Sequence, residues 1–172
     1  MKKWLAIAIV IGSLVACGGG DSRPTGPTAP ANVAASYTAT VTASSTCSAN
    51  LPTETLALDF LAELTQTGAA VQVKLIAHVP GVPENTFSGT VSGQTVTFPS
   101  FTFTQAMGRG AALAASGNAS LAANGLSLTG TLNGTYQTSS GASCNAANHQ
   151  LKLVKLCLQP TINGTAMLPC QQ

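Results

Sequence analysis

Residues 56–78 read Leu-Ala-Leu-Asp-Phe-Leu-Ala-Glu-Leu-Thr-Gln-Thr-Gly-Ala-Ala-Val-Gln-Val-Lys-Leu-Ile-Ala-His, and this stretch decides the fold class. Apolar side chains recur at every second position in residues 56–64 and again in residues 71–77. A period of two indicates a β-strand with one buried face, because successive side chains of a strand point to opposite sides. Residues 67–70 separate the two runs and predict a hairpin loop between antiparallel strands.

The charges of this hairpin agree with its hydrophobic pattern. A register that places Leu64 opposite Val73 aligns each acid of the first strand with a basic or imidazole side chain of the second. The two pairs are Glu63 with Lys74 and Asp59 with His78. Both pairs fall on the polar face, where opposite charges stabilise a sheet by a few tenths of a kcal/mol.

Two later segments resemble each other and predict further hairpins. Residues 87–98 and residues 128–136 each contain an apolar strand, a tight turn and a returning strand. The turns are expected at Ser92-Gly93 and at Asn133-Gly134. Asn-Gly is a strong hairpin signal, because both central positions of the turn need a positive φ.

Pro99 stands inside a strand pattern and predicts a β-bulge, because proline cannot donate a hydrogen bond to a neighbouring strand. Such a bulge would bring Phe98 onto the same face as Phe101 and Phe103. These three rings are then expected on the buried side of the sheet.

The remaining segments complete an all-β domain over residues 35–172. Residues 37–43 alternate Thr with apolar residues, residues 111–115 favour a strand over a helical turn, and residues 149–158 predict a last strand with an irregularity near Val154. The total is about eight or nine strands at regular spacing. We therefore expect an antiparallel meander closed into a small β-barrel, with a β-sandwich as the alternative.

The N-terminus carries an export signal. Lys2 and Lys3 precede a short apolar run that is too short to span a bilayer, which needs about 20 apolar residues. The run ends Leu14-Val15-Ala16-Cys17, which resembles the lipobox of bacterial lipoproteins. The alternative is an ordinary signal peptide followed by a chance cysteine.

The lipobox resemblance implies that residues 1–16 are a cleaved signal peptide and that Cys17 carries the lipid. Several acyl chains on one residue anchor a protein firmly, whereas one chain alone is marginal. The membrane is then a partner of the protein through this N-terminal lipid. Gly18 stands where an Asp would favour retention in the inner membrane, so the resemblance implies a cell-envelope protein anchored to the outer membrane. The domain could face either the periplasm or the cell exterior.

Residues 17–34 are rich in Gly and Pro and have no periodic apolar residues, which predicts a disordered tether. Its reach as a random coil is on the order of 20–25 Å. The tether would hold the domain near the membrane without fixing its orientation.

Four cysteines follow Cys17, and an even number in an exported domain indicates two disulfides. Three pairings are possible, and we favour Cys47–Cys144 with Cys157–Cys170. The first two cysteines sit in similar turn-like settings, and the last two flank a C-terminal loop that contains Pro and Gly. The bonds would contribute about 4–5 and about 3 kcal/mol on the chain-entropy view. Metal binding is the rival use, but no Cys-x-x-Cys pair occurs.

The charge balance excludes an electrostatic nucleic-acid binder. Of the seven Lys and Arg residues, Lys2 and Lys3 leave with the signal, so five cations remain against five acids. Since the mature chain is neutral and has no cluster of like charge, it lacks a basic footprint for nucleic acid.

The strand pattern over residues 35–158 resembles the calycin group, the lipocalin-like barrels that include bacterial lipoproteins. The chain also resembles bacterial lipoproteins with Thr-, Ser- and Gly-rich β-domains. The single tryptophan, Trp4, lies in the signal, so the Gly-x-Trp signature of lipocalins is absent. The resemblance implies a barrel and leaves the ligand open.

The sequence contains no recognisable catalytic motif. The two histidines, His78 and His149, are expected in surface or hairpin-end positions, and no Gly-x-Ser-x-Gly elbow is present. We expect no catalytic residue, metal or cofactor, and a hydrolase is the last of the alternatives.

Two interpretations of function remain. The first is a membrane-anchored, non-enzymatic structural or interaction lipoprotein with a filled core, in contact with another envelope protein. The second is a carrier whose barrel holds a small apolar ligand. The expected lining residues are Phe60, Leu75, Phe87, Phe98, Phe101 and Phe103. A cavity of several hundred Å³ would favour the carrier, and a closed core favours the structural role.

Overall fold

A computed structural model describes residues 28–77, 84–105, 111–138, 140–161 and 164–171. The expected signal peptide and lipobox, with Cys17, lie outside these residues, and so does His78, the expected partner of Asp59. Within the described ranges, no helix is long and apolar enough to cross a membrane.

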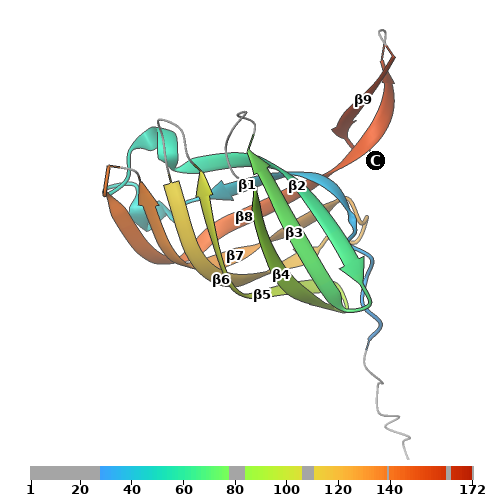
Figure 1. The fold of residues 1–172 in the computed structure, drawn as a ribbon, viewed down its shortest axis with the longest axis horizontal. Coiled ribbons are helices and arrows are strands. Elements are labelled where there is room, and N and C mark those ends of the chain that lie inside the picture. The colour runs from blue at the N-terminus through green and yellow to red at the C-terminus, as the bar shows by residue number, and fades with distance from the viewer. Residues whose placement is uncertain (1–27, 78–83, 106–110, 139, 162–163, 172) are drawn as a thin grey trace, which may run out of the picture.

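Antiparallel strands make up most of the described chain (Figure 1). Their bounds are β1 (Ala35–Thr42), β2 (Ala57–Thr67), β3 (Ala70–Ala77), β4 (Asn85–Ser92), β5 (Thr95–Gln105), β6 (Ala111–Leu121), β7 (Ser127–Thr138), β8 (Ser143–Thr161) and β9 (Gly164–Pro169). Two short 3-10 helices, η1 (Ser45–Cys47) and η2 (Thr53–Thr55), lie between β1 and β2.

The strands follow one another in sequence order, and the first eight close on themselves. β1 pairs with β2 on one side and with β8 on the other, while β9 pairs with β8 alone. The expected all-β meander and its closure into a small barrel are confirmed. The chain does not form the alternative β-sandwich.

The β2–β3 hairpin has the register expected from its sequence. Leu64 lies opposite Val73, and Glu63 lies opposite Lys74. The ion pair of Lys74 is made with a different acid, since its Nζ lies 2.9 Å from Oε2 of Glu84, just before β4. The cross-strand alignment was therefore predicted correctly, and the partner of Lys74 came from outside the hairpin.

The barrel buries its apolar face inside and turns a polar face outward. In β2, the buried side chains of Leu58, Phe60, Ala62 and Leu64 alternate with less buried positions such as Asp59. In β4, the outward positions are mostly threonine and serine. This alternation is that of strands packed around a central core.

The bulge expected at Pro99 is present. β5 pairs with β6 through Phe98 opposite Gly117 and then Phe101 opposite Ala115, so the register shifts between the two phenylalanines. Both rings are buried and therefore face the interior. The third expected member, Phe103, lies on β5, but its side chain is outside the described part of the structure.

The expected turn at Asn133-Gly134 is wrong, because β7 runs through it without reversing. The pairing with β8 instead shifts between Leu132 and Gly134. A Cβ on Gly134 would lie 2.7 Å from Cα of Ala115, so glycine is needed here for the close approach of β6. Local turn preference is overridden by pairing on both sides of the strand.

Two further boundaries differ from the expected ones. The β4–β5 turn consists of Gly93 and Gln94, one residue later than expected, because Ser92 still pairs with Thr95. The last barrel strand, β8, begins at Ser143 instead of at residue 149.

The irregularity expected near Val154 lies elsewhere. It falls at residues 147–148, between His149 opposite Leu132 and Ala146 opposite Gly134, and Asn148 has a φ of 69° there. Val154 itself keeps regular pairing with β1 and β7 on both sides.

Residues 31–34 are fastened to the barrel and are not part of a disordered tether. Val33 is 0% exposed, and its N–H donates to Oε1 of Gln66 at 2.8 Å. The Ala31 N–H donates to the Gly93 carbonyl at 2.7 Å. The expected domain start at residue 35 is therefore too late, because one buried valine and its backbone bonds lie upstream of β1.

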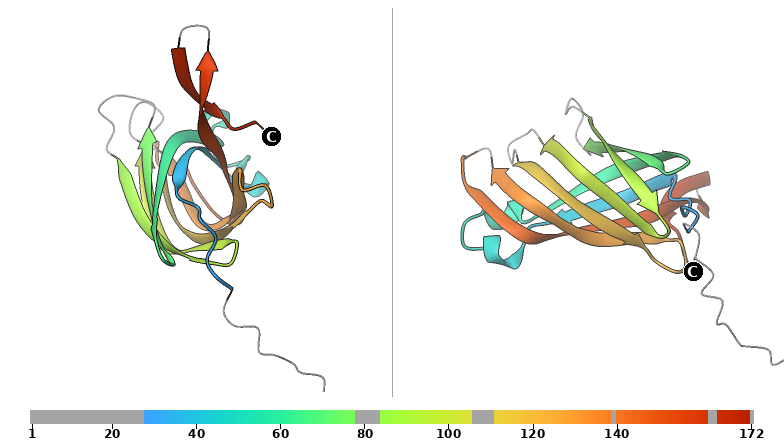
Figure 2. Two further views of the ribbon diagram at one scale, coloured as in Figure 1. Left: turned by 90° about the vertical axis from the view of Figure 1, so that its right-hand side faces the viewer. Right: turned by 90° about the horizontal axis from the view of Figure 1, so that it is seen from below.

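β8 continues beyond the barrel and returns as β9, forming a two-stranded ribbon that projects from one end (Figures 1 and 2). The expected C-terminal loop is thus a hairpin. Its base is crosslinked by Cys157–Cys170, whose Cα atoms are 5.0 Å apart.

Glycines in β7 let it lie unusually close to β6, which generates a prediction. A Cβ on Gly130 would lie 2.5 Å from Cα of Ala119, so Gly130→Ala forces the backbones of β6 and β7 apart. We expect a loss of about 1–3 kcal/mol of unfolding free energy, seen as a melting temperature lower by several degrees. The matched control is Thr129→Ala, at the exposed neighbouring position. Equal melting temperatures for the two variants would contradict the close approach.

Candidate functional site

The barrel interior holds most of the expected lining residues. Phe60, Leu75, Phe98 and Phe101 are buried, and Phe87 is half-buried. The Phe87 and Phe101 rings stack with centroids 4.4 Å apart, and Phe98 meets them edge-on at 5.6 and 6.1 Å. The pattern thus brings three of the rings into one cluster.

A small cavity lies beside this cluster. Leu75, Phe87, Phe98 and Phe101 line it, whereas Phe60 is buried away from it. The other lining residues were not expected from the sequence. They lie on β1, β3, β7 and β8 and are Ala39, Val41, Val73, Leu132, Leu151 and Leu153. The alternation of inward and outward side chains along β1, β3, β7 and β8 could have identified them, because all six face inward.

The cavity is too small for an organic ligand. Its volume is about 20 Å³, close to the space of one water molecule, whereas ligand pockets have about 300–1,000 Å³. The wall is entirely apolar, so a water there would have no polar partner. The part of the interior that these residues line is therefore filled by its own side chains.

Both ends of the barrel are tied by a buried tyrosine hydroxyl. At one end, the Tyr37 hydroxyl donates to the Val33 carbonyl at 2.9 Å. At the other, the Tyr136 hydroxyl donates to the Thr55 carbonyl at 2.5 Å. Each bond holds a segment outside the sheet, the N-terminal segment or the β1–β2 connection, against the core. Burial raises the pKa of both hydroxyls.

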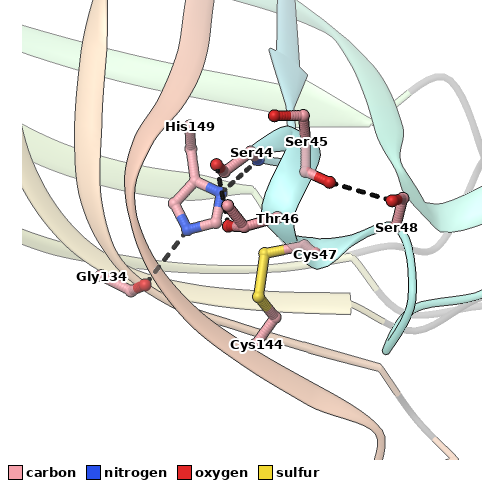
Figure 3. Close-up of a disulfide and its surroundings, with 8 residues drawn as sticks. All are labelled: Ser44, Ser45, Thr46, Cys47, Ser48, Gly134, Cys144 and His149. Atoms are coloured by element: carbon pink, nitrogen blue, oxygen red, sulfur yellow. Dashed lines mark hydrogen bonds between the residues drawn. A yellow bond between two sulfur atoms is a disulfide. The ribbon is translucent and has the colours of Figure 1, made fainter.

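His149 is a buried structural group and not the surface residue that we expected. It is 0% exposed, its Nδ1 accepts from the Ser44 N–H at 3.0 Å, and its Nε2 lies 3.1 Å from the Gly134 carbonyl (Figure 3). Since Nδ1 accepts, the neutral ring carries its hydrogen on Nε2 and donates it to Gly134. The Ser44 hydroxyl bonds Thr46 instead of the ring. Both ring nitrogens are therefore occupied by backbone, and neither is free to activate a nucleophile.

The first disulfide lies next to this histidine (Figure 3). Cys47 of η1 is bonded to Cys144 of β8, with Cα atoms 5.5 Å apart. Together with Cys157–Cys170, this is the pairing favoured from the sequence. Over the described ranges, no group of three His, Cys, Asp or Glu side chains is arranged to hold a metal ion.

An open groove runs over the outside of this end of the barrel. Its volume is about 550 Å³, and it is lined mainly by hydroxyl and amide side chains without a charge. These polar residues are Thr42, Ser44, Ser45, Thr46, Ser48, Asn148 and Gln150. No local pattern identifies this groove, because its residues come from segments about 100 positions apart in the sequence.

No family model, curated protein or solved structure matches the chain.

The buried hydroxyls predict how stability depends on pH. Unfolded tyrosines lose their protons near pH 10, whereas the folded ones hold theirs to higher pH. The contribution of the two protonated hydroxyls to the free energy of unfolding is therefore fully present below about pH 10 and is lost as the pH rises above it. The sequence contains only two tyrosines, Tyr37 and Tyr136, so tyrosinate absorbance reports on both.

In an alkaline titration, this absorbance should rise only together with the loss of the β-sheet circular dichroism signal. Tyr37→Phe should show the same coincidence with half the amplitude. Tyrosinate formation near pH 10 in a chain that keeps its native spectrum would contradict the burial of the hydroxyls.

Proposed function

We propose that this chain is an exported lipoprotein, anchored to the outer membrane through Cys17, whose barrel is a structural or interaction domain without enzymatic activity. The observation that carries the proposal is the close packing around the phenylalanine cluster, where the cavity has a volume of only about 20 Å³. A carrier would need an order of magnitude more space.

The anchor rests on the sequence. Leu14-Val15-Ala16-Cys17 follows a charged and then apolar leader, which is the order of a lipoprotein signal. Two disulfides support an oxidising compartment outside the cytoplasm. A lipid on Cys17 would hold the barrel at the envelope, where a polar outer face suits contact with another envelope protein.

The carrier remains the second candidate, because the half-buried Phe87 ring borders the apolar cavity. Accepting a ligand would require Phe87 and its stacked partner Phe101 to separate. A hydrolase has no comparable support, since both nitrogens of His149 are bonded to backbone groups.

The test is native mass spectrometry of the protein purified from its own membrane. We expect one species whose mass is that of the chain from Cys17 onward plus its acyl groups, with no other molecule bound. The control is Cys17→Ser, which has no thiol to modify and should lack the added lipid mass. A stoichiometric apolar small molecule would replace the structural role by the carrier, and an unmodified Cys17 would refute the anchor.

A further inference from the structure

The projecting β8–β9 ribbon carries the exposed large apolar side chains of the described chain. Leu158 is 72% exposed, Met167 45% and Leu168 41%. The other large apolar residues of the described chain are buried or half-buried, so exposure of this degree is confined to the ribbon. Exposed apolar side chains on a projecting element are suited to contact with a partner or a membrane.

Pairing places four apolar residues on one face of the ribbon. Leu156 lies opposite Pro169, and Leu158 lies opposite Met167. Side chains of directly opposed residues share a face, and positions two apart on a strand do so as well. Leu168 lies opposite Cys157 and therefore points to the other face. The disulfide Cys157–Cys170 stabilises a ribbon that would be marginal in water by itself.

The charges that β8 itself carries are positive. Lys152 is exposed and shares the face of Leu156 and Leu158, whereas Lys155 is half-buried and points to the other face. No Asp or Glu occurs in the sequence after Glu84. Lysines next to an apolar face suit an anionic lipid surface, because each near-surface cation is attracted to it.

The ribbon leaves the barrel at the end where the described N-terminal segment begins (Figure 2). β1 starts at this end, with Tyr37 paired to Lys155, and Thr28 lies against Gly93 of the β4–β5 turn. From Cys17 to Thr28 the chain advances by 28 − 17, or 11, residues. A random coil of that length reaches about 17–20 Å. A lipid on Cys17 would keep this end of the barrel near the bilayer.

We propose that the β8–β9 ribbon is a second membrane contact, with Leu158 and Met167 inserted into the bilayer interface and Lys152 at the headgroups. This proposal rests on the proposed lipid anchor at Cys17. The ribbon orients the barrel, which a Gly- and Pro-rich tether alone cannot do.

A second copy of the chain is a poorer occupant. The ribbon pairs six residues on each strand, a length of about 20 Å, and its apolar face covers roughly 200 Å². A stable dimer interface needs about 800 Å² from each partner. Insertion of a few apolar side chains into an interface already close to the lipid anchor has no such area requirement.

The experiment uses the absence of tryptophan after Trp4, since the mature chain then has none. Leu158→Trp introduces a unique probe on the ribbon, and Ser45→Trp introduces a matched probe at an exposed position at the other end of the barrel. Each acylated variant is placed in vesicles of phosphatidylethanolamine and phosphatidylglycerol, with and without brominated acyl chains.

We expect the Leu158→Trp emission to shift to shorter wavelength and to lose most of its intensity in brominated vesicles, while Ser45→Trp keeps a water-like spectrum. Quenching of neither probe in a chain whose mass shows acylation overturns the ribbon contact and leaves the anchor standing. A shift without quenching, growing with protein density, overturns it in favour of a second copy. A mass without acyl groups overturns the anchor and this proposal with it.

Discussion

The structure depends on the pairing of β1 with two neighbours at once. Because β1 bonds both β2 and β8, the sheet closes on itself, and its shortest pairing is between β4 and β5, which bond only over residues 90–92 and 95–97. The period of two then has a single consequence, since each strand buries one face in a common core. A small domain with few aromatic residues gains its stability in this way from many modest side chains, supported by two disulfides.

Closure leaves two open ends, and the chain covers each with a segment held by buried hydrogen bonds. The Tyr37 hydroxyl holds the N-terminal segment, and the Tyr136 hydroxyl holds the β1–β2 connection. The hydrogen bond from Ser44 to His149 and the Cys47–Cys144 disulfide also hold that connection in place. These buried polar groups thus hold the two connecting segments against the core.

Patterns that depend on neighbours in sequence were predictable, and contacts between distant segments were not. The register at Leu64 and the bulge at Pro99 follow from local alternation and from the missing proline N–H. The turn at Asn133-Gly134 failed because its local preference yields to the strands on either side. The burial of His149 depends on Ser44, which lies 105 residues away, and no local pattern signals it. Four of the six expected lining residues meet at the cavity, but its size depends on side-chain packing that alternation does not specify.

The most direct test of the account is nuclear magnetic resonance of the barrel, with cross-strand nuclear Overhauser contacts and amide exchange measured along β1. Closure predicts contacts from Val41 both to Leu58 on β2 and to Leu151 on β8, with β1 amides protected as strongly as those of β6 and β7. Contacts to only one neighbour, with fast exchange along the free side of β1 or β8, would show an open sheet and contradict the account.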